Sequence, residues 1–150
     1  KDSRVGAFGA LALMIVLMLK ISLLVELSIM APLGLVMGQS LSRATPVIQL
    51  GFQSYVRRDD PESKSRDVAR SGQIQALVAG CWVLLLLALG WWWAALSMAT
   101  MVGMVVSMAI VAGVFGAYVH RRVGGLTGDF LGAIQQLSEV AILMVLVVGT

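Results

Sequence analysis

Long apolar runs constrain this chain more than any other feature. Each is about 20 residues long, the length at which an α-helix crosses a hydrocarbon layer near 30 Å thick. The runs cover approximately residues 5–25, 29–52, 74–96, 98–119 and 130–148. Only 13% of the residues are charged, against roughly 25% in ordinary soluble domains. The pattern predicts an all-α fold, a polytopic integral membrane helix bundle with about five transmembrane helices, in which residues 1–150 form a single membrane domain.

The basic residues gather in short segments between these runs, which argues against nucleic acid as a partner despite the net charge of +3. If the runs cross the bilayer alternately, three basic segments lie on the same side. They hold nine of the eleven Lys and Arg residues, namely Lys1, Arg4, Arg57, Arg58, Lys64, Arg66, Arg70, Arg121 and Arg122. Because positive residues are enriched in cytoplasmic loops, we expect this side to face the cytoplasm.

The first residues do not have the pattern of a secretory signal. The opening KDSRVGAFGA lacks the basic, apolar and small-residue regions of a cleaved signal peptide, and residue 1 is Lys rather than Met. We interpret this as an internal start. The expectation is that the chain is the C-terminal portion of a longer protein whose N-terminal part is absent.

Three ionisable residues, Lys20, Arg43 and Glu139, lie inside apolar runs. Charges at membrane depth are costly, and they usually face protein or water rather than lipid. Counted at 1.5 Å per helical residue, all three lie at similar depths, about 15 to 22 Å from the basic side. This predicts an ion pair or a small buried network among them.

Two of the expected helices carry polar stripes. In the fifth run, residues at offsets of 0, 3, 7 and 10 share one helical face: Asp129, Gly132, Gln136 and Glu139. In the second run a similar stripe consists of Gln39, Ser42, Gln49 and Gln53. One interpretation is a water-accessible cavity that opens to the cytoplasm; the other is hydrogen bonding between helices. We favour the second for the glutamines, and a functional role for Asp129 and Glu139.

The segment HRRVGGLTGDFLGA precedes the fifth helix. Its glycines, Gly124, Gly125 and Gly128, allow close approach of a ligand, and free N–H groups at a helix start favour phosphate. Arg121 and Arg122 add positive charge, while Asp129 is suited to a divalent cation that bridges phosphate oxygens. The structural alternative is a glycine turn in which Thr127 or Asp129 caps the helix and the arginines determine topology.

The opening residues have a related character. Lys1, Asp2, Ser3 and Arg4 form a charged and hydroxylated approach to the first helix. They are suited either to contact with phosphate or to anchoring a span at the membrane interface, and from the pattern alone we prefer the anchor.

Taken together, KDSRVGAFGALAL, the polar helix that contains Arg43, and RRVGGLTGDFLGAIQQLSEVA resemble the cobalamin synthase family, the adenosylcobinamide-GDP ribazoletransferases. The resemblance is most specific in the last of these segments and covers about half of the residues. The order and spacing of the segments are similar to the C-terminal part of that family.

The resemblance implies a Mg²⁺-dependent transferase in the bacterial or archaeal cytoplasmic membrane. It would join α-ribazole, or its 5′-phosphate, to adenosylcobinamide-GDP and release GMP. The family's aspartate-rich DGxxDxxDG motif lies upstream of KDSR and does not occur in this sequence, so we expect this chain alone to be inactive. Its other expected partners are membrane lipid, the missing N-terminal part and, as an open possibility, a second copy of the protein.

Site residues carry over from the resemblance only at matching positions. Asp129 and Glu139 are the expected catalytic residues, and Asp129 and Asp2 the expected metal ligands. The substrate and phosphate groups would be bound by Lys1, Asp2, Ser3, Arg4, Arg121, Arg122, Gly124, Gly125, Thr127 and Gly128.

Two other functional classes remain open from composition. In a transporter or channel subunit, Lys20, Arg43 and Glu139 would form a polar path for a solute or proton. A noncatalytic assembly subunit would use its small residues as packing seams.

Overall fold

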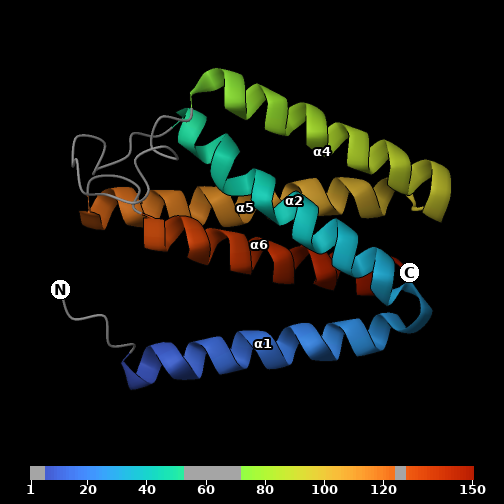
Figure 1. The fold of residues 1–150 in the computed structure, drawn as a ribbon, viewed down its shortest axis with the longest axis horizontal. Helices are drawn as coiled ribbons and strands as arrows, with labels where there is room; N and C mark the ends of the chain where they lie inside the picture. Colours follow the sequence, from blue (N-terminus) through green and yellow to red (C-terminus); the bar gives the residue numbers. More distant parts are fainter. Residues whose placement is uncertain (1–5, 53–71, 124–127) are drawn as a thin grey trace.

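The computed structural model describes residues 6–52, 72–123 and 128–150, and within these residues all regular structure is helical (Figure 1). The elements are α1 (Ala7–Leu27), a 3₁₀ turn η1 (Ser28–Met30), α2 (Ala31–Phe52), α4 (Gln73–Ala94), α5 (Met98–Val123) and α6 (Gly128–Gly149). Four stretches are long and apolar enough to cross a membrane, and the first of them, Ala7–Phe52, contains both α1 and α2. The predicted all-α membrane bundle with about five helices is confirmed.

The helices run back and forth along one direction (Figure 1). Helix α2 crosses the bundle at an angle and packs on both α4 and α6, while α5 runs beside α6 and α1 lies along the edge against α6 and α2. The starts of α1, α4 and α6 and the ends of α2 and α5 therefore lie at one end of the molecule. This is the alternating arrangement of helices that the sequence predicted.

Tight connections produce this arrangement at the opposite end. Helix α1 ends where Ser28 takes a positive φ of 50°, and α2 folds back so closely that a Cβ on Gly34 would lie 2.5 Å from Leu27 Cδ1. Between α4 and α5, Ala95 adopts the left-handed conformation, and the Ser97 hydroxyl accepts a 3.0 Å hydrogen bond from the Thr100 backbone N–H. Both turns satisfy helix ends that would otherwise be costly in lipid.

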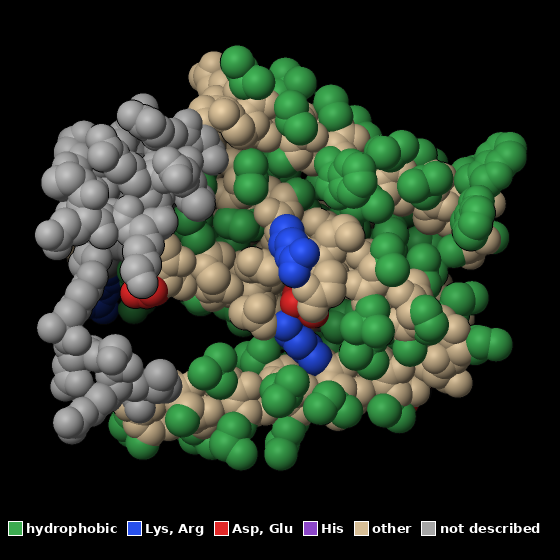
Figure 2. Space-filling view, in the orientation of Figure 1, with side chains coloured by type: hydrophobic (Ala, Val, Ile, Leu, Met, Phe, Trp, Pro, Cys, Tyr) green, Lys and Arg blue, Asp and Glu red, His purple; other side chains and the backbone are tan. Residues whose placement is uncertain are grey.

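The core lies where α2, α5 and α6 meet. Its fully buried side chains include Leu41, Met104 and Leu143. Helix α1 contributes one buried residue, Leu27. Large apolar side chains cover much of the outer surface (Figure 2), as expected for helices whose solvent is lipid.

Helix α5 extends further than predicted. It continues to Val123 and carries His120, Arg121 and Arg122 in its last turn, where the sequence suggested a loop. Positive side chains near a helix C-terminus interact favourably with the helix dipole, so these residues extend the helix instead of ending it.

Candidate active site

The structure describes five of the predicted site residues, Arg121, Arg122, Gly128, Asp129 and Glu139. The remaining predicted positions lie outside the described residues: Lys1, Asp2, Ser3, Arg4, Gly124, Gly125 and Thr127.

Two adjoining helix ends bring opposite charges to the same end of the bundle. Arg121 and Arg122 are exposed in the last turn of α5, and Asp129 is exposed in the first turn of α6. The Arg122 guanidinium lies 5.9 Å from the centroid of the Tyr118 ring, a cation–π contact that orients the side chain. Asp129 is favoured at its position because a carboxylate complements the positive end of the helix dipole.

The polar stripe of α6 divides into an open half and a closed half. Asp129 and Gly132 are exposed. Apart from its chain neighbours and the nearby backbone of its own helix, no described residue has a heavy atom within 4 Å of where a Gly132 Cβ would be. One turn further, Gln136 is half-buried, and Glu139 is 3% exposed. The stripe therefore leads from an accessible helix start to a covered interior.

The closed half is a charged cluster built from three helices. Lys20 Nζ of α1 lies 2.6 Å from Glu139 Oε2 of α6 and also donates to Gln136 Oε1. Gln39 of α2 donates to Glu139 Oε1 at 2.7 Å. Both oxygens of the carboxylate thus accept a hydrogen bond. The predicted buried ion pair is confirmed for Lys20 and Glu139.

Arg43 does not belong to this cluster, which corrects the predicted three-residue network. Its side chain is exposed and lines a surface groove between α2 and α4, together with Ser40 and Trp82. Its neighbours in this groove come from α2 and α4, whereas other residues of α2 beyond it, such as Leu50, still pack against α6. Of the three charges, Lys20 and Glu139 are the two that form an ion pair within the described residues.

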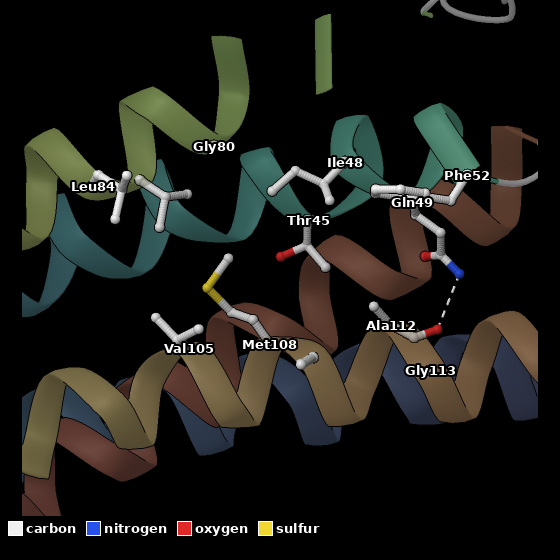
Figure 3. A pocket seen from close by; sticks show the side chains of 12 residues that line it. Thr45, Ile48, Gln49, Phe52, Gly80, Leu84, Val105, Met108, Ala112 and Gly113 are labelled. Carbon is white, nitrogen blue, oxygen red and sulfur yellow. Dashed lines mark hydrogen bonds between the residues drawn. The ribbon is translucent and has the colours of Figure 1, made fainter. Parts of the chain in front are cut away.

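The polar stripe of α2 also does not line one cavity. Gln39 bonds to α6, whereas Gln49 donates to the Ala112 carbonyl of α5 at 3.0 Å (Figure 3). Ser42 is buried and donates to the Gln39 carbonyl on its own helix at 3.3 Å. These glutamines hold helices together, as we favoured, and Gln53 lies outside the described residues.

A groove that the sequence did not predict lies between α2, α4 and α5 (Figure 3). Its volume is about 560 Å³. The Thr45 side chain points into it, and its buried hydroxyl has no hydrogen-bond partner among the described residues. Small residues at Gly80, Ala112 and Gly113 leave this space, but such residues are so common in membrane helices that they give no distinctive signal.

A second opening lies between α1 and its neighbours (Figure 2). It reaches the charged side chains at the centre of this face. The burial pattern agrees, because residues 7–15 of α1 are all exposed and the first half-buried position is Val16. The open half of the α6 stripe and the exposed half of α1 therefore lie at the same end of the bundle.

The described residues supply little for a metal on their own. Among them, no three His, Cys, Asp or Glu side chains lie close enough together to hold an ion. Among the described residues, Asp129 supplies the carboxylate at the end of the bundle that carries Arg121 and Arg122. A single protein carboxylate is compatible with Mg²⁺ in general, because this ion usually keeps several waters.

Comparison with known proteins gives consistent matches along the whole chain. Residues 1–147 match the family model described as cobalamin-5-phosphate synthase. The chain is 39% identical over 158 residues to an adenosylcobinamide-GDP ribazoletransferase of Shewanella frigidimarina, in an alignment that covers 99% of this chain and 57% of the relative. It is 40% identical over 152 residues to the protein of that name from Shewanella woodyi, covering 97% and 56%. The chain thus spans little more than half the length of these relatives, and no solved structure matches it.

Proposed function

The chain belongs to the cobalamin-5-phosphate synthase family, and from this premise we propose that it forms part of a transferase that joins α-ribazole, or its 5′-phosphate, to adenosylcobinamide-GDP. In this reaction a ribazole hydroxyl attacks the phosphorus that carries the cobinamide. A new oxygen–phosphorus bond forms, the bond from that phosphorus to GMP breaks, and the hydroxyl proton is lost. The enzyme would act as part of cobalamin biosynthesis.

The observation that carries this proposal is the arrangement of charge at one end of the bundle. Arg121 and Arg122 end one helix, and Asp129 begins the next beside an open helical face at Gly132. Adenosylcobinamide-GDP carries a diphosphate, and α-ribazole 5′-phosphate would add a phosphate of its own. Fixed positive charge near the phosphate oxygens favours a transition state in which negative charge increases on the phosphate and the leaving group.

We assign Asp129 as the organiser of the phosphate site and a ligand of Mg²⁺, which would supply neutralisation of phosphate charge when bound. Arg121 and Arg122 recruit the anionic substrates. Asp129 or a carboxylate from the rest of the full-length protein accepts the hydroxyl proton. Glu139 lies ten residues further along α6, about 15 Å from Asp129 along the helix axis, so the two carboxylates do not share one reacting centre.

The opening residues are proposed to complete the same site. Lys1, Asp2, Ser3 and Arg4 precede α1 in sequence, and α1 begins at the end of the bundle that holds Asp129. Gly124, Gly125, Thr127 and Gly128 connect the arginines to Asp129 and are suited to phosphate through backbone N–H groups. We place this end at the cytoplasmic face of the inner membrane, and the aspartate-rich motif in the remaining part of the full-length protein.

The test is the Asp129→Asn variant of the full-length protein, with release of GMP as the readout. Its turnover should fall by a factor of 100 or more at saturating Mg²⁺, of the order seen when one stabilising group at a reacting centre is lost, while the amount of protein in the membrane is unchanged. The matched control is Glu26→Gln, because Glu26 is also exposed but lies at the other end of α1. Near-normal turnover in Asp129→Asn would remove this residue from the site.

A further inference from the structure

We propose that Lys20 and Glu139 are positioning residues: they hold α1 at the innermost point of the opening between α1 and α6 and thereby fix its width. The importance of that width rests on the proposed function, which places the transfer site at the end of the bundle where α1 and α6 begin. The holding of α1 itself can be tested without any reaction.

The first step of the argument is how little else attaches α1 to the bundle. From Val16 to its end, α1 turns one seam toward its neighbours, consisting of Val16, Leu19, Lys20, Leu23, Leu24 and Leu27. Five of these six residues are apolar, and lipid tails are as apolar as leucine, so burial of the seam gives no strong preference for one arrangement. Lys20 is the polar member of the seam. A single polar residue in an apolar seam specifies alignment at some cost in stability.

The second step is the number of contacts that converge on this lysine. Lys20 donates to Glu139 and Gln136 on α6, and Gln39 on α2 holds the other carboxylate oxygen of Glu139. The cluster therefore attaches α1 directly to α6 and, through Glu139, indirectly to α2. Its members are well covered, since the side chains of Lys20 and Glu139 are 13% and 4% exposed. In a setting of low dielectric such hydrogen bonds are strong.

The third step is that a small displacement at Lys20 becomes a larger one at the start of α1. The far end of α1 is held by the turn at Ser28, where Leu27 packs against Gly34. At 1.5 Å per residue, Lys20 lies about 12 Å from this turn and Ala7 about 32 Å. A displacement of about 1 Å at Lys20 would thus become between two and three Å at the start of α1. A misplacement of that size in a substrate-binding segment is enough to lower a rate substantially.

The fourth step concerns what Glu139 itself can do. Both of its oxygens already accept hydrogen bonds, and Gln136 lies between it and the open half of the stripe. It therefore acts through α1 rather than on a substrate. This explains a carboxylate at membrane depth without assigning it a reaction step.

The experiment measures the opening directly in the intact protein in lipid nanodiscs. Spin labels are attached at Ala10→Cys on α1 and Ala117→Cys on α5, two exposed positions, in a Cys81→Ser background because Cys81 is a free, exposed thiol. The distance distribution is compared between the parent, Lys20→Met/Glu139→Gln and the charge swap Lys20→Glu/Glu139→Lys. Neutralising both residues leaves no unpaired buried charge. The swap preserves the pair, because the amides of Gln39 and Gln136 can donate or accept after rotation.

We expect the neutral pair to broaden or shift the distribution by several Å and to lower kcat/KM for transfer at least tenfold. The swap should restore both toward the parent. Arg43→Gln is the matched control, since Arg43 is a charge in an apolar run outside the cluster, and it should leave the distance unchanged. An unchanged distance in the neutral pair overturns the proposal, with or without loss of turnover, and so does a changed distance at normal turnover. Absence of transfer in the parent would instead refute the proposed function. The distances would still test whether Lys20 and Glu139 hold α1 in place.

Discussion

For the buried pair of Lys20 and Glu139, removing one charge should cost more stability than removing both. Desolvation of each charge is compensated by the other and by the two glutamines. Removing one charge leaves its partner buried and unpaired, which typically costs about 3 kcal/mol or more. Removing both charges loses the ion-pair attraction but also removes the cost of desolvating the two charges.

We therefore predict that Glu139→Gln alone lowers the thermal unfolding midpoint of the detergent-solubilised protein clearly more than Lys20→Met/Glu139→Gln does. The single variant should lose about 3 kcal/mol of unfolding free energy and the double variant less than about half of that. Thermal unfolding followed by circular dichroism measures both. Equal midpoints for the parent and Glu139→Gln would mean that the contact contributes nothing to stability.

Gly132 gives a second prediction at the scale of one residue. Apart from its chain neighbours and its own helix backbone, no described residue would contact a Cβ at this position. Gly132→Leu should therefore fold normally, and its stability should even rise slightly because leucine has the better helix propensity. The added side chain would stand on the open face beside Asp129. We expect kcat/KM for transfer to fall at least tenfold, the scale of a contact worth about 1.4 kcal/mol.

The control for this variant is Gly113→Leu. Gly113 is equally open but lines the groove between α2, α4 and α5, away from Asp129. It should retain normal kcat/KM. If both leucine variants behaved alike, the open face at Gly132 would not be a substrate surface.

The spacing of polar residues predicted which side chains share a face but not which helix that face meets. Offsets of three and four placed Gln136 and Glu139 together, and similar depth paired Lys20 with Glu139. Arg43 has the same depth and was expected beside them, yet it faces α4. Helix crossing angles decide this, and they follow from packing of whole surfaces rather than from the local pattern.

At the scale of elements, the turn between α4 and α5 holds a residue in an unfavourable conformation. Ala95 caps α4 with φ of 49° and ψ of 35°, a left-handed geometry that glycine adopts without the clash of a Cβ. We predict that Ala95→Gly raises the unfolding free energy by roughly 0.5–1 kcal/mol. Chemical or thermal unfolding in detergent measures the change.

The comparison variant is Ala117→Gly. Ala117 is exposed within α5, where glycine should lower the unfolding free energy by about 1 kcal/mol. The two substitutions are chemically identical and should act in opposite directions. The same sign for both would contradict the assignment of a left-handed cap at Ala95.

Helix positions were predictable because apolar length alone determines a span. The observed α4 and α6 begin and end within about two residues of the apolar runs. The largest difference was the extension of α5 to Val123, since basic residues that signal a loop in a membrane sequence also stabilise the last turn of a helix.

For the whole molecule, alternation of spans predicted which helix ends lie together but not how the helices pack. Leucine-rich seams fit many partners equally well, so the choice of α2 as the helix that packs on both α4 and α6 left no clear mark in the sequence. The groove between α2, α4 and α5 follows from that packing and was likewise not predictable. The same limit applies to the site: its charged ends were recognised, whereas the opening beside α1 depends on three helices.

The arrangement of helix ends leads to a prediction about orientation. The end of α5 with Arg121 and Arg122 should face the cytoplasm, and the turn between α4 and α5 should face the other side. In a Cys81→Ser background, a membrane-impermeant maleimide added to intact cells should label Ser97→Cys in that turn. It should label His120→Cys, which is exposed near the end of α5, only after the membrane is permeabilised. The reverse pattern would place the basic ends outside, where cytosolic nucleotide substrates could not reach Asp129, and would exclude the proposed transferase site.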